Sequence, residues 1–243
     1  MKHFAAMLGR VLSSWMAARG LIVAETEEGT GDQSSATADI LRQPGKKFLH
    51  VGCGESRMPD VGPGFLCGEW SEIRLDIDPS ASPDIVSSML DMPLVPSASV
   101  DAVYSSHNIE HLYPHEVPVA LVEFFRVLKP DGLLVLACPD LQSLSRLIVE
   151  DRLDQPAYMS PAGPIAPLDV LYGHRPQLAE GNLFMAHHTG FTLRTLVEAI
   201  RAAGFRSVAG KSRDVYFDLW VVASKEPLSE PEMQTLASIH FPQ

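Results

Sequence analysis

Short apolar runs, each about the length of one β-strand, recur through the middle of the chain. They predict strands near residues 48–51, 73–77, 85–88, 100–105 and 133–138. Residues 116–128 instead carry apolar side chains at helical spacing, with Pro118 in the first turn, and predict a helix. Strands that alternate with helices indicate a doubly wound α/β fold on a mostly parallel sheet, in which ligands bind at the carboxyl ends of the strands.

The later part of the chain predicts an antiparallel end to this sheet. A helix beginning near Leu193 stops at Gly204, and the runs 205–209 and 216–223 then predict a strand hairpin. Before that helix, residues 141–190 are rich in proline and predict an insertion that covers the substrate, with regular structure only around residues 141–153. Residues 226–243 are interpreted as a C-terminal tail.

The first residues differ in character from the rest. Residues 1–24 have apolar side chains at helical spacing and predict an amphipathic helix, which either packs on the domain or contacts a membrane surface. A secretory signal is a third interpretation, although Arg10 interrupts its apolar stretch. Residues 25–38 have neither periodicity nor bulk and predict a flexible linker, so the main domain spans residues 39–225.

Two features predict a nucleoside site. The first strand ends in Gly52-Cys53-Gly54, and the second ends at Asp76. Glycines allow a sharp turn that exposes backbone N–H groups, and a carboxylate at the next strand end can accept hydrogen bonds from both ribose hydroxyls. A dinucleotide fingerprint would have a third glycine where this chain has Arg57, so NAD and FAD are disfavoured.

Further motifs follow in order. Residues 100–112, Val-Asp-Ala-Val-Tyr-Ser-Ser-His-Asn-Ile-Glu-His-Leu, and residues 123–132, which end in Leu-Lys-Pro-Asp-Gly, resemble the fourth strand and the late turn of the class I S-adenosylmethionine (SAM)-dependent methyltransferases, in particular small type-11-like domains. The resemblance covers residues 46–140 closely and 186–225 loosely. It implies a Rossmann-like fold, SAM as cofactor and methyl transfer as activity.

The resemblance also implies which residues bind the cofactor. These are Gly52, Cys53, Gly54, Asp76, Ile77, Asp91, Met92 and Ser106. Asp91 would accept from the adenine amino group and Met92 would cover the ring; alternatively, Asp91 only caps a turn before Pro93.

The chain departs from the family in two places. His50 stands where relatives commonly have an acid that orients the amino-acid end of the cofactor. Residues 54–72 contain too many prolines and glycines for the usual long first helix, so this crossover is expected to be short or irregular.

The sequence says less about which molecule accepts the methyl group. Ser105-Ser106-His107-Asn108 does not match the motif of exocyclic-amine methyltransferases, which leaves an oxygen or carbon of a small molecule, lipid or sugar. Candidate bases are His107, His111, His187 and His188, each of which can equally be structural. A non-catalytic SAM-binding scaffold or regulatory protein is the alternative function.

A remote alternative is a zinc hydrolase, because His107-x-x-Glu110-His111 matches a pattern with two ligands one helical turn apart. That pattern needs a sustained helix, whereas here it follows a strand and is soon interrupted by Pro114. We therefore expect no metal ligands.

Composition agrees with a globular enzyme. The chain has 243 residues and a formal net charge of −11, which disfavours binding to bulk nucleic acid. Its three cysteines form neither an even disulfide set nor a metal-binding spacing, which indicates a cytoplasmic protein. The sequence leaves the oligomeric state open.

Overall fold

The computed structural model describes residues 27–58, 60–66 and 69–242. The amphipathic helix predicted for residues 1–24 lies outside them. Contacts divide the chain into two units, Met1–Ala36 and Thr37–Gln243, and the second unit carries the sheet.

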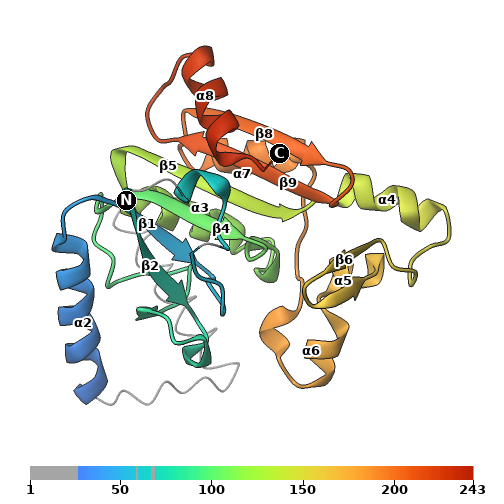
Figure 1. The fold of residues 1–243 in the computed structure, drawn as a ribbon, viewed down its shortest axis with the longest axis horizontal. Coiled ribbons are helices and arrows are strands. Elements are labelled where there is room, and N and C mark those ends of the chain that lie inside the picture. Colours follow the sequence, from blue (N-terminus) through green and yellow to red (C-terminus); the bar gives the residue numbers. More distant parts are fainter. Residues whose placement is uncertain (1–26, 59, 67–68, 243) are drawn as a thin grey trace. The chain divides into compact units, whose positions relative to one another are not determined.

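Within the described residues, seven strands form one sheet in the order β3-β2-β1-β4-β5-β9-β8 (Figure 1). They are β1 (Lys46–Val51), β2 (Trp70–Asp76), β3 (Ile85–Val86), β4 (Val100–Ser106), β5 (Leu128–Pro139), β8 (Ser207–Arg213) and β9 (Asp218–Ser224). Neighbours are parallel from β3 to β5, whereas β9 runs antiparallel to both β5 and β8. This confirms the predicted mostly parallel α/β fold with an antiparallel end. The strand order reverses between β1 and β4, which is where such sheets bind ligands.

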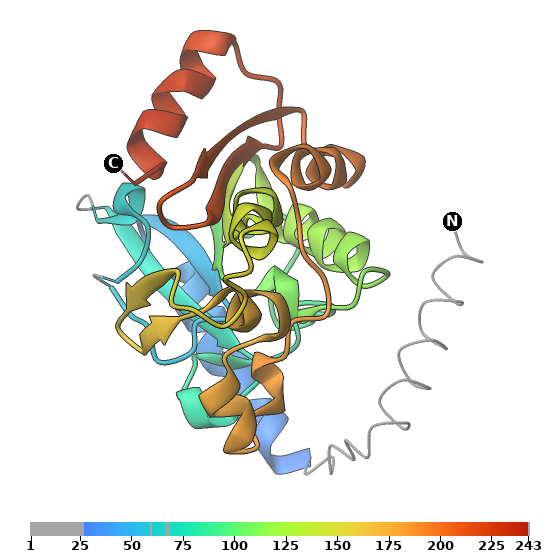
Figure 2. The ribbon, with the colours of Figure 1, turned by 90° about the vertical axis from the view of Figure 1, so that its right-hand side faces the viewer.

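Alternate side chains of the strands feed two separate cores. On one face, strand residues such as Leu49 and Val103 pack with α3 (Val117–Val127) and α7 (Leu193–Ala202). On the other face, Phe48 and its neighbours pack with η1 (Pro63–Phe65) and α8 (Glu230–His240) (Figure 2). Both faces of the sheet are covered, which explains the continuous apolar runs at residues 133–138 of β5 and 219–223 of β9.

The predicted crossover after β1 is irregular, as expected. Among its described residues only η1 is helical. The helix predicted over residues 116–128 ends at Val127, but the turn expected at residues 129–132 is wrong, because these residues belong to β5, which begins at Leu128. Val100 pairs with Leu128 and Ala102 with Leu133, so the extra residues of β5 form an irregularity within the strand rather than a turn before it.

Two segments are more regular than the sequence predicted. Residues 25–38 were expected to be a linker, but α2 runs from Glu27 to Arg42. No proline interrupts this stretch, and Ile40 and Leu41 in its last turn pack against the core, so tertiary contacts support a helix that local propensity alone does not favour. The predicted tail contains α8, whose Met233 and His240 are buried. Its capping box at Ser229 and Glu232 was the local signal for this helix.

The insertion lies between β5 and α7. It contains α4 (Leu141–Val149), β6 (Tyr158–Ser160), β7 (Gly163–Ile165), α5 (Pro167–Tyr172), α6 (Arg175–Ala179) and η4 (Leu183–Met185). The short elements follow from the many prolines. Isolated bridges join Gly173 to Ala186 and Asp140 to Phe191, so the end of the insertion returns to the carboxyl end of β5. No helix in the described part of the chain is long and apolar enough to cross a membrane.

Candidate functional site

The loop after β1 turns sharply at its two glycines. Gly52 has φ +66° and Gly54 has φ +49°, both in the left-handed region that favours glycine. The amides of Gly52 and Cys53 donate to the carbonyl of Leu75 at 2.9 and 3.2 Å, which ties the loop to β2. Burial raises the pKa of Cys53 to about 11, so its thiol stays protonated at neutral pH.

Asp76 stands at the end of β2, beside this loop. One oxygen of its carboxylate accepts from the Gly54 amide at 2.7 Å, and the other accepts from the Asp78 amide at 2.9 Å. Each carboxylate oxygen can accept a further hydrogen bond, and the side chain is only half-buried. The fold therefore fixes Asp76 in place while leaving it able to accept from a diol.

Asn108, just after β4, lies directly against Gly52. Its amide donates to the carbonyl of Val51 at 3.1 Å, so the turn after β4 is bonded to the end of β1. A Cβ added to Gly52 would come within 2.1 Å of the Asn108 side chain. Glycine at residue 52 is therefore required both by φ and by the close approach of β4.

Arg74 is a buried cation that joins two loops. Its guanidinium donates to the carbonyls of Gly54 and Ser56 at 2.5 and 3.2 Å. It also donates to the carbonyls of Ser82 and Ala81 at 2.7 and 3.2 Å. Five planar donors suit this arrangement, and the side chain holds the glycine loop against the loop after β2.

His50 is paired with an acid from the neighbouring strand. Its Nδ1 lies 2.7 Å from Glu72 Oε1, and the other oxygen of Glu72 accepts from the Met58 amide at 3.1 Å. Burial lowers the pKa of His50, although the Glu72 carboxylate opposes this. The histidine of β1 is thus bonded to a carboxylate of β2.

The other expected cofactor residues have different settings. Ile77 and Asp91 are exposed, and Ser106 is the last residue of β4. Met92 is fully buried in the core, with its amide donating to Glu123. The contacts of these four residues with a cofactor stay predictions.

The loop and strand ends fit a nucleoside-bearing cofactor. A Cβ added to Gly54 would meet nothing within 4 Å, so open space lies where the loop has no side chain. Asp76 faces the same loop with acceptor capacity to spare. The amides of Gly52, Cys53 and Gly54 are already bonded within the protein, so the groups that the loop region offers to a ribose are the open space and the fixed carboxylate at the point where the strand order reverses.

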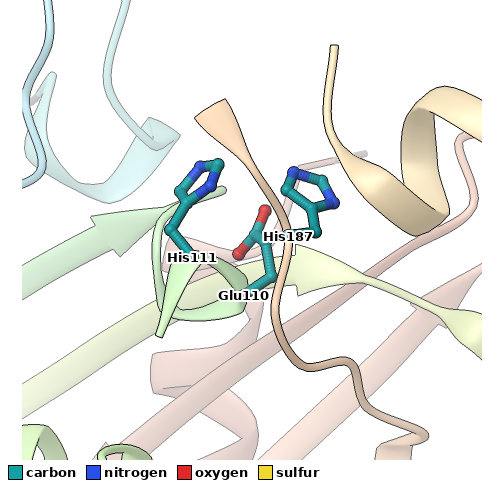
Figure 3. A group of neighbouring side chains, drawn as sticks. All are labelled: Glu110, His111 and His187. Carbon is teal, nitrogen blue, oxygen red and sulfur yellow. The ribbon is translucent and has the colours of Figure 1, made fainter. Parts of the chain in front are cut away.

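Three of the candidate histidines lie near Glu110, and Figure 3 shows two of them, His111 and His187. Glu110, His111 and His187 offer ligand atoms that all lie within 4.8 Å of one another, and Figure 3 shows the carboxylate between the two rings. His107 Nδ1 lies 3.6 Å from Glu110 Oε1. His188 instead stacks on Tyr113, with ring centroids 4.2 Å apart. The structure therefore brings His107, His111 and His187 together and sets His188 apart.

The charges in this cluster are coupled. Burial alone would raise the pKa of Glu110. His107 and the nearby His111 and His187 have a larger, opposite effect, so the pKa of Glu110 is lowered. Burial alone would lower the pKa of His107, but the Glu110 carboxylate has the larger effect, and the pKa of His107 is raised. Burial lowers the pKa of His187 despite the Glu110 charge. Glu110 is therefore a carboxylate, and His187 is neutral.

The helical zinc pattern is absent. His107 has φ +50° and follows β4 directly, and only Ile109–His111 forms a short 3-10 turn. His107 and His111 therefore do not share the face of an α-helix, and the helix-based zinc hydrolase interpretation is wrong. The reason is local, since the strand ends one residue before the pattern begins.

Sequence reasoning missed Arg74, Asn108 and the role of Glu72. Each is a polar residue that the fold buries or half-buries beside the glycine loop. A signal was present for Arg74, because a charged residue between Ile73 and Leu75 interrupts an apolar strand. Nothing local distinguished Asn108, whose contacts depend on β4 lying beside β1.

Comparison with known proteins gives one family match. Residues 49–136 match the model of a family described as a methyltransferase domain. No curated protein matches.

Solved structures are similar at low identity. A SAM-dependent methyltransferase from Methanosarcina mazei has 18% identity and a TM-score of 0.49, covering 77% of this chain and 96% of its own. The 1,6-didemethyltoxoflavin-N1-methyltransferase of Burkholderia thailandensis, with its substrate and S-adenosylhomocysteine bound, has 17% identity and a TM-score of 0.48, covering 93% and 90%. A SAM-dependent methyltransferase from Archaeoglobus fulgidus has 17% identity and a TM-score of 0.48, covering 79% and 94%.

Proposed function

We propose that the chain, whose residues 49–136 match a methyltransferase-domain family, is a class I SAM-dependent methyltransferase that transfers a methyl group from S-adenosylmethionine to an oxygen or carbon of a small-molecule, lipid or sugar acceptor. The observation that carries this proposal is the bonded arrangement of Gly54 and Asp76 at the strand ends next to the reversal of strand order.

In this proposal Asp76 accepts from the ribose hydroxyls, and the backbone of Gly52, Cys53 and Gly54 lies against the cofactor. Arg74 and Asn108 act as positioning residues, because they bond the glycine loop to its neighbours. Asp91, Met92, Ile77 and Ser106 complete the proposed set.

SAM supplies a methyl group that is already activated by the sulfonium charge, so the protein mainly has to orient the acceptor and exclude water. An acceptor hydroxyl also has to lose its proton. The histidines around Glu110 are placed for this at the carboxyl end of β4, and His107 is the half-exposed member. His188 remains a weaker candidate.

The acceptor class rests on motif and charge. Ser105-Ser106-His107-Asn108 lacks the exocyclic-amine pattern, and a net charge of −11 opposes polyanionic acceptors. Cys53 and Cys138 are both buried and free in the described residues, which agrees with the cytoplasmic location included in this proposal.

Cofactor selectivity is the first test. Purified protein is titrated with SAM, S-adenosylhomocysteine and NAD while Tm is measured, because a ligand that binds the native state raises Tm. We expect both adenosyl ligands, and not NAD, to raise it. Stabilisation by NAD alone would contradict the proposal.

Catalysis is tested separately with methyl-labelled SAM and panels of hydroxylated small molecules, sugars and lipids. We expect label transfer and S-adenosylhomocysteine formation with one of these panels. SAM binding without turnover on any panel would favour the scaffold alternative.

A further inference from the structure

Glu110 is an unusual buried carboxylate. Its side chain is 1% exposed, and neither oxygen has a hydrogen-bond partner. His107 lies nearest among the charged groups, but at 3.6 Å it is beyond hydrogen-bond length for an ion pair of this kind. A buried carboxylate without close donors costs several kcal/mol unless a cation compensates it. The local chemistry therefore calls for a positive charge at this place.

Two neighbouring histidines are held by carbonyl groups on their Nδ1 side. His111 Nδ1 lies 3.1 Å from the carbonyl of Ala186, and His187 Nδ1 lies 2.7 Å from the carbonyl of Val170. A carbonyl oxygen can only accept, so in the neutral form of each ring Nδ1 carries the proton and Nε2 keeps the lone pair that a metal ion would use. Histidines that bind metals are usually held in this way, with the second ring nitrogen donating to a carbonyl.

Main-chain bonds hold the two parts of the cluster together. The carbonyl of Glu110 accepts from the amides of His188 and Thr189 at 2.9 and 3.2 Å. The amide of His187 in turn donates to the carbonyl of Tyr172 at 3.2 Å. The end of the insertion is thus fixed against the turn after β4, and the cluster does not depend on side-chain contacts alone.

We propose that Glu110, His111 and His187 bind a divalent transition-metal ion. The three groups come from two segments, and Figure 3 shows the Glu110 carboxylate between the rings of His111 and His187. Two imidazole nitrogens and one carboxylate suit Zn²⁺, Co²⁺, Fe²⁺ or Mn²⁺ and leave coordination positions open. This departs from the sequence-based expectation of no metal, because His187 lies 76 residues beyond His111.

The position of the ion also specifies the acceptor, a step that rests on the proposed methyltransferase function. The cluster follows β4, whose neighbour β1 carries the glycine loop. An open coordination position there would take an acceptor hydroxyl and lower its pKa, so that its proton can leave to solvent. The inferred substrate class is therefore a hydroxylated small molecule that coordinates metal through oxygen.

The binding test uses the full chain, treated with EDTA and dialysed against Co²⁺ or Zn²⁺, with metal content measured by mass spectrometry. We expect about one ion per chain and Co²⁺ absorption bands typical of nitrogen and oxygen ligands. Glu110→Gln and His187→Ala should each weaken binding at least tenfold. His115→Ala is the matched control, because His115 is exposed and outside the cluster, and it should bind as the unaltered protein does.

Binding of neither ion at millimolar concentration would overturn the proposal, as would equal binding by all variants. If Glu110→Gln fails to fold, paramagnetic broadening by Mn²⁺ in the unaltered protein decides, since the ring signals of His111 and His187 should broaden before that of His115. Calorimetry with SAM on the metal-free protein keeps the two proposals apart. SAM binding without metal binding would remove only this inference, and metal binding without SAM binding would remove only the proposed function.

Discussion

The amide of Gly54 donates to the carboxylate of Asp76 across 2.7 Å, and this bond joins the loop after β1 to the end of β2. The same carboxylate also accepts from the amide of Asp78, so two backbone donors fix its orientation. Asp76 is therefore both a structural acceptor and the group proposed to bind the ribose, and these roles make different predictions for different substitutions.

Asp76→Ala should weaken SAM binding by about tenfold or more, because it removes the acceptor of the ribose hydroxyls. Asp76→Asn should weaken it too, since the amide group turns a donor toward one backbone N–H. Calorimetry measures both dissociation constants. Asp131→Asn, an exposed residue at the start of β5, is the control. Unchanged affinity in Asp76→Ala would remove Asp76 from the cofactor site.

The two glycines of the loop should respond differently to alanine. Gly52→Ala adds a Cβ within 2.1 Å of Asn108 at φ +66°, and we expect a loss of unfolding free energy above about 2 kcal/mol. Gly54→Ala adds a Cβ into open space at φ +49° and should cost only about 1 kcal/mol. Urea unfolding at neutral pH measures both.

SAM binding separates the glycine variants further. Gly54→Ala should bind SAM more weakly although it stays folded, because the added methyl group enters the space left for the ligand. A Gly54→Ala variant with unchanged SAM affinity would show that the cofactor does not approach this residue.

Arg74→Lys should loosen the glycine loop. A lysine ammonium cannot reproduce the planar donors that reach the carbonyls of Gly54, Ser56 and Ser82, and we expect a loss of about 2–3 kcal/mol. Hydrogen exchange should rise in both loops, and SAM affinity should fall. The exposed Arg57→Lys is the control and should change none of these. Equal exchange in Arg74→Lys and the unaltered protein would contradict the positioning role.

The burial of His240 predicts that the protein loses stability in mild acid. It is buried against Gly64 and Phe65, and burial lowers its pKa from 6.5 to about 4. Between about pH 6.5 and pH 4, His240 therefore binds a proton in the unfolded chain but not in the folded chain. Stability from the neutral ring is complete above about pH 6.5 and falls toward pH 4, by up to about 3 kcal/mol.

The measurement compares urea unfolding at pH 7.5 and 5.0 for the unaltered protein and His240→Asn, which removes the titrating ring. We expect a smaller loss of stability between these pH values in the variant. The same pH dependence in both proteins would mean that His240 opens to solvent.

Much of the fold was predictable because it depends on local pattern. The apolar runs near residues 48–51 and 100–105 are buried on both faces, so their strands were visible without a partner. The linker prediction for residues 25–38 was wrong because a polar composition does not exclude a helix. The tail prediction for residues 226–243 was wrong because the capping box of α8 is a weaker signal than hydrophobic periodicity.

The alternation of strands and helices, the glycine loop after β1 and the acid at the end of β2 could be predicted, since each follows from neighbouring residues. The contact of Asn108 with Gly52, the joining of two loops by Arg74 and the approach of His187 to Glu110 instead come from the folded arrangement. These contacts depend on which strands lie side by side and on how a long insertion returns to the sheet. Residue patterns along the chain do not carry that information, because a side chain has no local sign of the distant group that it will contact.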